Sequence, residues 1–218
     1  MRLQLPIALL LLTVGSASAA PLVAIDLFGP GDGRVTRDAD AGLDWLDLIV
    51  TGSLVLDPHN PRIVYPSYDA IVGNVGGWAA DGWRHATAEE ICRLFITHAV
   101  APDPCPGDEI LLEGDRVSDL QALLGITGTT TSGIPFVQIS ASSGVFGEPD
   151  PTTGLVGRAS LVLTRSVFHT NSIARVVPGT VLTGFEYSYG HFLVRPIPEP
   201  ATALLLGAGL AALAVRRR

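Results

Sequence analysis

The chain of 218 residues has a formal net charge of −7 at pH 7, and all fourteen of its positive charges are arginines. Nucleic acids and anionic membrane surfaces attract clusters of basic side chains, so this acidity argues against both as partners. Once the two distinctive ends described below are set aside, enough residues remain for one domain with its own hydrophobic core.

The amino-terminal end has the three parts of a secretory signal peptide. A short positive start at Arg2 precedes the apolar block 7–12, and small residues end the segment at 17–19. We expect cleavage after Ala19, because a cut one residue later would place Pro21 at the new amino terminus. Residues 1–19 are therefore predicted to direct export and to be removed.

The mature chain begins with a series of short strands. Gly- and Pro-rich turns between runs of β-branched residues are typical of such strands. The pattern predicts strands over 22–28, 34–37 and 43–48, with a turn over 29–33 between the first two.

Two or three short helices follow in the middle of the chain. Thr87 and Glu90 form the pattern of a capping box, and apolar residues then recur at helical spacing. A second helix is expected to start at Ser118, with Gln121 in the reciprocal capping position and Gly125 at its end. Residues 68–72, after Ser67, are expected to form one or two turns of a third.

The second half alternates between apolar strands and polar loops. Strands are expected over 135–140, 159–167, 173–177, 185–189 and 192–195, and loops over 125–133 and 142–157. The predicted fold class is α+β: a strand-rich single domain over 20–196, with two or three short helices and a transmembrane-type helix after it.

The mature part contains two cysteines, Cys92 and Cys105. An exported protein meets an oxidising compartment, and an isolated pair there indicates one disulfide. The sequence predicts this bridge without showing that the two backbones approach each other.

The carboxy-terminal segment 197–218 again has three parts. The tripeptide Pro198, Glu199 and Pro200 precedes an uncharged apolar run over 201–215, and the chain ends with Arg216, Arg217 and Arg218. A helix over this run would be about 22 Å long, which is short for a bilayer core of about 30 Å. The arginines would stay in the cytoplasm and orient the helix with its amino end outside.

This tripeptide, short helix and basic tail resemble the PEP-CTERM sorting signal of Gram-negative bacteria. The resemblance implies processing by an exosortase-type membrane protease, with transient insertion into the inner membrane through 201–215. It also implies a final location at the cell surface or in an exopolysaccharide or biofilm matrix. A plain carboxy-terminal membrane anchor remains the alternative.

Three patches of the mature region resemble an ectodomain that recurs in proteins with this signal. They lie at 36–47, 82–90 and 192–195 and contain Trp45, Trp83 and Arg84. More distantly, the patches are similar to the C-type-lectin-like domain of bacterial collagen-like adhesins. We expect structural roles for both tryptophans, which are large enough to anchor a small core, and for Arg84, which could pair with a buried carboxylate near the start of a helix.

Clusters of carboxylates suggest possible binding sites. Asp38, Asp40 and Asp44 could supply oxygen ligands to calcium, although the spacing is not that of an EF-hand and a solvated turn is the simpler interpretation. The tripeptide 148–150, Glu-Pro-Asp, is similar to one that coordinates calcium and sugar in C-type lectins, but its companion motif is absent. A polar turn explains it equally well, and no cofactor is expected apart from this possible calcium.

No catalytic motif appears in the sequence. The five histidines form no metal-binding pair of the kind found in metalloproteases, and there is no nucleophile elbow. The leading hypothesis is a non-enzymatic surface or matrix protein that binds or packs within extracellular polysaccharide. A secreted hydrolase of matrix polymers and a calcium-stabilised adhesion module are the alternatives.

Overall fold

The structure is a computed structural model that describes residues 21–55, 62–98, 100–101, 105, 110–113, 115–132, 137–167, 170–184 and 189–197. The predicted signal peptide and residues 198–218 of the sorting segment lie outside these ranges. None of the helices in the described part of the chain is long and apolar enough to cross a bilayer.

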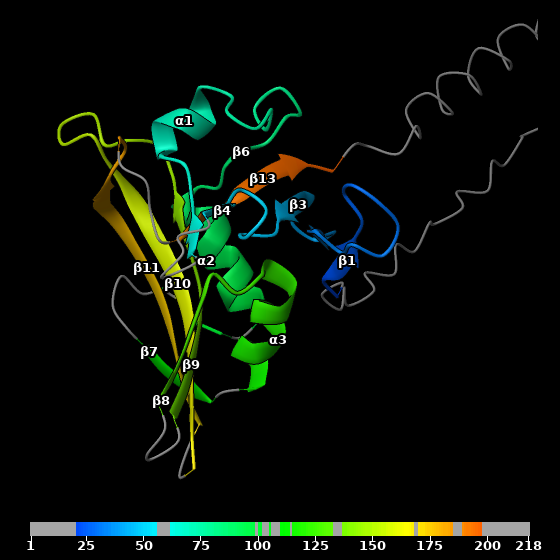
Figure 1. Ribbon diagram of the computed structural model, residues 1–218, viewed down its shortest axis with the longest axis vertical. Helices are drawn as coiled ribbons and strands as arrows, with labels where there is room; N and C mark the ends of the chain where they lie inside the picture. Colours follow the sequence, from blue (N-terminus) through cyan, green and yellow to red (C-terminus); the bar gives the residue numbers. More distant parts are fainter. Residues whose placement is uncertain are drawn as a thin grey trace, which may run out of the picture.

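Two helices lie between two mainly antiparallel sheets (Figure 1). The smaller sheet has the strand order β1-β2-β3-β13-β6, and the larger has the order β12-β9-β10-β11-β7 with β8 beside β9. Strands β4 and β5 form a separate pair. The smaller sheet and this pair contain β1 (Val23–Ile25), β2 (Val35–Asp38), β3 (Leu43–Leu46), β4 (Ser53–Val55), β5 (Arg62–Val64), β6 (Arg84–His85) and β13 (Leu193–Pro196).

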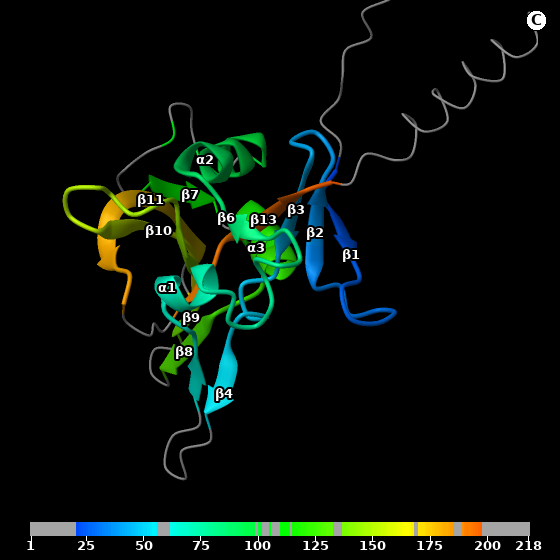
Figure 2. The same ribbon diagram turned by 90° about the horizontal axis from the view of Figure 1, so that it is seen from above.

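The larger sheet is built around three long strands. It contains β7 (Ile110–Glu113), β8 (Gly128–Ser132), β9 (Val137–Phe146), β10 (Leu155–Ser166), β11 (Thr170–Leu182) and β12 (Gly190–His191). The helices are α1 (Tyr68–Val72), α2 (Ala88–Thr97) and α3 (Asp115–Leu124). Seen from above in Figure 2, α2 and α3 separate β1–β3 from β10 and β11, whereas α1 lies beside β9. The expected strand-rich α+β class with short helices is thus confirmed.

The main core is formed by side chains from both sheets and both central helices. Trp45 of β3, Phe95 of α2, Leu120 of α3 and Leu161 of β10 belong to one buried cluster. Trp45 is 1% exposed, which confirms that it anchors the core. Aromatic side chains of this size bury 150–250 Å² in typical cases. The burial of Trp45 therefore contributes strongly to the packing of the sheets and helices.

Two of the three predicted helix starts are confirmed. The Thr87 hydroxyl accepts from Glu90 N, and the Glu90 carboxylate accepts from Thr87 N, so the capping box of α2 is complete. The Ser67 hydroxyl caps α1 by accepting from Ala70 N, without a reciprocal bond. The third prediction is wrong in detail, because α3 begins at Asp115 and the Gln121 side chain is buried against β9 and β10 instead of capping.

Two predicted loops contain strand. The predicted loop 125–133 contains β8 at 128–132, and the predicted loop 142–157 contains the end of β9 and the start of β10. Threonine favours strands because its β-branched side chain fits a pleated surface, which accounts for β8. In β9 the small residues are needed for packing: a Cβ on Gly144 would lie 2.8 Å from Leu48 Cδ2 and 2.9 Å from Phe192 Cδ2.

The remaining strand predictions hold with shifted bounds. Strands β1, β2 and β3 fall within or beside the expected ranges, and β10, β11 and β13 overlap theirs. Residues 185–188 of one predicted strand lie outside the described residues.

The segment Gly190–Pro196 connects the two sheets. Strand β12 runs parallel to β9 in the larger sheet, and β13 pairs with β3 and β6 in the smaller one. Between them, Phe192 N donates to Val145 O at 3.0 Å, and Phe192 O accepts from Ala86 N at 2.8 Å. The segment 190–196 therefore joins the two sheets, because β12 belongs to the larger sheet and β13 to the smaller one.

Candidate functional site

A cleft of about 430 Å³ opens between α1, β6 and the turn that follows β9. Its aromatic residues are Tyr68, Trp83 and His85, and its polar residues include Arg84 and Glu148. We call it the aromatic cleft. Ligand pockets of small molecules usually have about 300–1,000 Å³ and combine apolar walls with a few polar groups, and this cleft fits that description.

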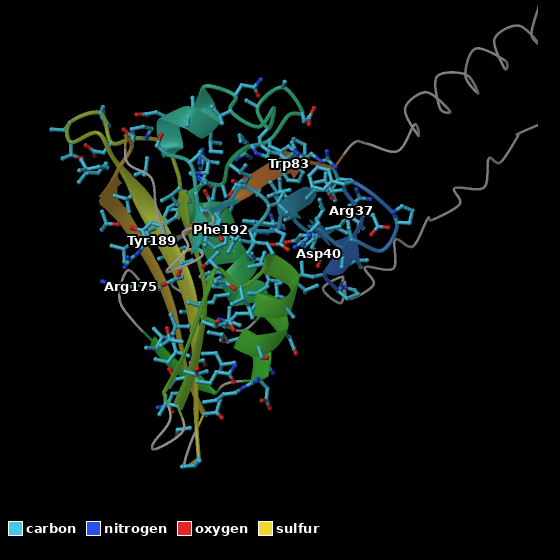
Figure 3. All side chains as sticks on the ribbon, viewed as in Figure 1. Arg37, Asp40, Trp83, Arg175, Tyr189 and Phe192 are labelled. Carbon is cyan, nitrogen blue, oxygen red and sulfur yellow. A yellow bond between two sulfur atoms is a disulfide. The ribbon has the colours of Figure 1, made fainter. Side chains whose placement is uncertain are left out.

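Trp83 and Tyr68 are held firmly in its walls. Trp83 is 4% exposed, and the Arg195 guanidinium lies 4.5 Å from the centre of its ring in a cation–π contact. The label in Figure 3 places Trp83 close to β13, the strand that carries Arg195. Tyr68 is the first residue of α1, whose orientation is fixed by the Ser67 cap. Its ring stacks on that of His85 at 4.1 Å.

Charged groups lie along the rim of the cleft. The Arg84 guanidinium binds both oxygens of Glu90, at 2.6 and 2.9 Å, and this ion pair holds the pKa of the Glu90 carboxyl below its usual value. Glu148 is exposed, and the bond from Gly147 N to Ala86 O (2.7 Å) positions its turn. Burial, and then the nearby charge of Glu148, raises the pKa of Tyr68.

A pair of buried histidines lies behind the cleft wall. His85 Nε2 is 3.0 Å from His191 Nδ1, and His191 Nε2 is 2.8 Å from Pro66 O. A carbonyl can only accept, so His191 carries its proton on Nε2 and its Nδ1 accepts from His85. Burial lowers the pKa of His85 to about 3, helped by the neighbouring ring, and that of His191 to about 4 against the opposing bond to Pro66 O. Both rings are neutral at pH 7.

These groups can bind a ligand that has a flat apolar face and several hydroxyl groups. The exposed Val72 and Ala79 offer an apolar surface, whereas the rings of Tyr68 and Trp83 are buried behind it. The exposed Glu148 carboxylate can accept hydrogen bonds from hydroxyls. Arg84 and Thr87 add donors at the same rim. A sugar unit has this combination of surfaces.

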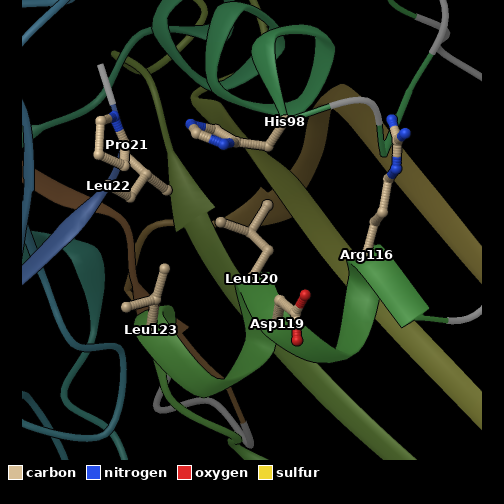
Figure 4. A pocket seen from close by; sticks show the side chains of 7 residues that line it. All are labelled: Pro21, Leu22, His98, Arg116, Asp119, Leu120 and Leu123. Atoms are coloured by element: carbon tan, nitrogen blue, oxygen red, sulfur yellow. The ribbon is translucent and has the colours of Figure 1, made fainter. Parts of the chain in front are cut away.

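A second, smaller pocket of about 230 Å³ lies where the described chain begins (Figure 4). Pro21 and Leu22 form one side, Leu120 and Leu123 of α3 form the floor, and His98 at the end of α2 lies across from them. Burial lowers the pKa of His98, although Asp38 and Asp40 oppose this shift. Leu22 packs against the main core, so the first described residues already contact the domain.

The predicted disulfide is present. Cys92 in α2 and Cys105 are bonded, with their Cα atoms 5.4 Å apart. The bridge ties the segment after α2 back onto that helix.

The two tryptophans singled out from the ectodomain resemblance are buried, whereas the partner of Arg84 is not the buried carboxylate that was expected. Trp45 and Trp83 are buried, and Arg84 forms an ion pair at the start of α2. Its partner Glu90 is partly exposed, with 21% of its side chain accessible.

The structure does not bring Asp38, Asp40 and Asp44 together as ligands. Asp44 is fully buried, and its carboxylate binds Arg37 at 2.8 and 3.1 Å and Arg195 at 3.4 Å. The Asp38 carboxylate accepts from Ala41 N in the turn, and the labels in Figure 3 place Arg37 and Asp40 at this end of the smaller sheet. No group of three or more potential metal ligands occurs in the described part of the chain. The calcium prediction therefore has no support in this geometry.

The two acidic residues of the tripeptide 148–150 have different roles. Glu148 lines the aromatic cleft, whereas Asp150 Oδ1 accepts from Thr152 N and Thr153 N and closes a turn. The polar-turn interpretation therefore describes Asp150. Sequence reasoning missed the cleft and the pair formed by His85 and His191, because these residues are far apart in the chain and each histidine looks isolated.

The predicted sorting residues Pro198, Glu199, Pro200, Arg216, Arg217 and Arg218 lie outside the described residues. Residues 196–218, however, match the PEP-CTERM protein-sorting motif. This motif indicates export, sorting to the cell surface by way of the membrane, and processing by an exosortase membrane protein. No curated protein and no solved structure is significantly similar to the chain, so the C-type-lectin-like resemblance stays a prediction.

Proposed function

We propose that this protein is a non-enzymatic component of the cell surface or extracellular matrix of a Gram-negative bacterium, and that it binds exopolysaccharide through the aromatic cleft. The observation that carries the proposal is the sorting motif at 196–218, whose first residue is the last residue of β13. A protein exported in this way meets secreted polymers as its nearest abundant partners.

The cleft supports a carbohydrate as the ligand. Its exposed apolar residues Val72 and Ala79 suit the apolar face of a sugar ring, and Glu148 suits the hydroxyl groups. The net charge of −7 makes an anionic polymer a poor partner and a neutral or cationic one a better match.

Strand β13 connects the cleft to the tail, and cleft residues contact it along its length, since Trp83 also lies against Arg195. Leu193 at the start of β13 pairs with His85 of the cleft, and Pro196 at its end pairs with Leu43.

Binding can be tested with purified exopolysaccharide and a matched pair of variants. Ala79 and Ala80 are both exposed, but only Ala79 is among the residues lining the cleft. Ala79→Trp should fill the cleft and weaken binding by about tenfold or more, which is 1.4 kcal/mol, whereas Ala80→Trp should bind like wild type. Calorimetry or co-sedimentation would measure both affinities.

A second pair tests the carboxylate. Glu148→Gln removes a charged acceptor, and hydrogen bonds to charged groups contribute about 1.5–3 kcal/mol, so we expect a loss of affinity of about tenfold or more. Glu89→Gln, on the exposed first turn of α2, is the control. Equal binding by all four variants would disprove the cleft as the site. Release of new reducing ends from the polymer would instead support the alternative of a secreted hydrolase.

A further inference from the structure

The sorting motif begins inside the folded domain. Its first residue, Pro196, is the last residue of β13 and pairs with Leu43. Ile197 N then donates to Gly42 O at 2.9 Å. The tripeptide starts at the next residue, Pro198, so no spacer separates it from the sheet.

Strand β13 cannot easily supply extra length by detaching. It is an inner strand between β3 and β6, and the side chains of Leu193 and Val194 are fully buried. Arg195 is bonded to buried Asp44 and lies over the ring of Trp83. Unpairing β13 would expose two core side chains and separate the two halves of this ion pair.

The short connection limits how far the tripeptide can lie from the domain. An extended chain spans at most about 3.6 Å per residue, so Pro200 lies within about 11 Å of Ile197. A protein that closes over the tripeptide therefore has to fit beside the turn formed by residues 39–42, to which Ile197 is bonded.

This turn is well fixed. The Asp38 carboxylate accepts from Ala41 N at 2.9 Å, and Arg93 of α2 donates to Asp40 O at 2.6 Å. Gly42 has φ +69°, a conformation that other residues rarely adopt. Ala39 and Asp40 are exposed at its tip. The turn 39–42 is therefore a rigid surface for any protein that approaches the tripeptide.

We propose that the turn 39–42 is a contact surface for the exosortase-type membrane protein that processes the motif, so that the tail is recognised together with the adjacent end of the domain. The occupant follows from the motif, because the processing protein must reach a segment that starts one residue beyond the sheet. The domain therefore restricts how its own tail is processed.

The test places an obstruction on this surface and then moves the surface away. In the full-length precursor, Ala39→Trp adds a large side chain at the tip, and Ala80→Trp is the control in an exposed loop outside the cleft lining. Each variant is also made with an eight-residue Gly/Ser insertion between Ile197 and Pro198. Pulse–chase labelling in the producing cells measures the rate at which precursor is converted to processed protein.

Ala39→Trp should be processed at least about fivefold more slowly than wild type, and the insertion should restore the wild-type rate. Ala80→Trp should match wild type with and without the insertion. Ala39→Arg is a second, chemically different obstruction in case the tryptophan variant folds poorly. Processing of both Ala39 variants at the wild-type rate would overturn the proposal, as would slow processing that persists after the insertion. A changed membrane association of Ala39→Trp in cells lacking the processing protein would also overturn it, since the turn would then face lipid.

Discussion

Acidification should destabilise the domain through the histidine pair behind the cleft. His85 and His191 are neutral in the folded protein, with pKa values of about 3 and about 4, because burial disfavours their charged forms. In the unfolded chain both would titrate near pH 6.5. Between these values the unfolded state binds more protons than the folded state, so the free energy of unfolding falls as the pH falls below about 6.5.

The size of the effect follows from the same shifts. One pKa unit corresponds to about 1.36 kcal/mol, so each ring should cost about 2 kcal/mol of stability at pH 5, and the pair about 4 kcal/mol. Domains of ordinary stability have about 5–15 kcal/mol in total. The loss is therefore large enough to shift an unfolding curve clearly, or to unfold a marginal domain.

Urea unfolding of the wild type and of His191→Gln at pH 7.5 and pH 5 would measure this. The glutamine amide can donate to Pro66 O in place of His191 Nε2, and its oxygen can accept from His85. The variant should lose about 2 kcal/mol less than wild type between the two pH values, since only one of the two rings remains. His98, whose pKa burial also lowers, contributes equally to both proteins and cancels in the comparison. Equal losses in the two proteins, or a loss below about 1 kcal/mol in the wild type, would refute the reasoning.

Three further predictions concern stability and can be measured by chemical denaturation. Reduction of the bond between Cys92 and Cys105, which closes a separation of 13 residues, should cost about 3 kcal/mol in the chain-entropy account; an unchanged midpoint would contradict it. Gly144→Ala should cost about 1–3 kcal/mol, because its Cβ would lie 2.9 Å from Phe192 Cδ2 in a packed core. Thr87→Ala should cost about 1 kcal/mol through loss of the α2 cap, whereas Thr87→Ser should retain most of the stability.

Local signals in the sequence were sufficient for much of the fold. The capping box at Thr87 and the cap at Ser67 depend on residues three positions apart, so the chain itself contains the information. The pairing of Cys92 with Cys105 followed from export and from there being no other cysteine in the chain. In the two caps the partners are close in sequence, and for the disulfide the chain contains no other cysteine that could pair.

Contacts between distant segments were not predictable in this way. Ser142 and Gly144 looked like loop residues because small side chains are common in loops, yet both lie in β9. At Gly144, Leu48 and Phe192 leave no room for a side chain. Gln121 fitted a capping pattern but instead bonds the carbonyls of Ser140 and Leu161. The groups that determine which residue fits at these positions lie across the core, in distant segments of the chain. A single sequence does not show which segments will meet there.

The candidate site depends on the same long-range assembly. His85 and His191 are separated by 106 positions and meet because β12 and β13 return the end of the chain to β6 and β9. The five residues after His191 therefore serve the cleft and the tail at once: Leu193 pairs with His85, and Pro196 begins the sorting motif. Removal of β13 would open the smaller sheet beneath Trp83, so a chain whose tail is cut upstream of Leu193 should lose the cleft as well as its sorting. Processing downstream of Ile197 would leave every described contact of the cleft intact, which is the arrangement expected if the protein functions after its tail has been removed.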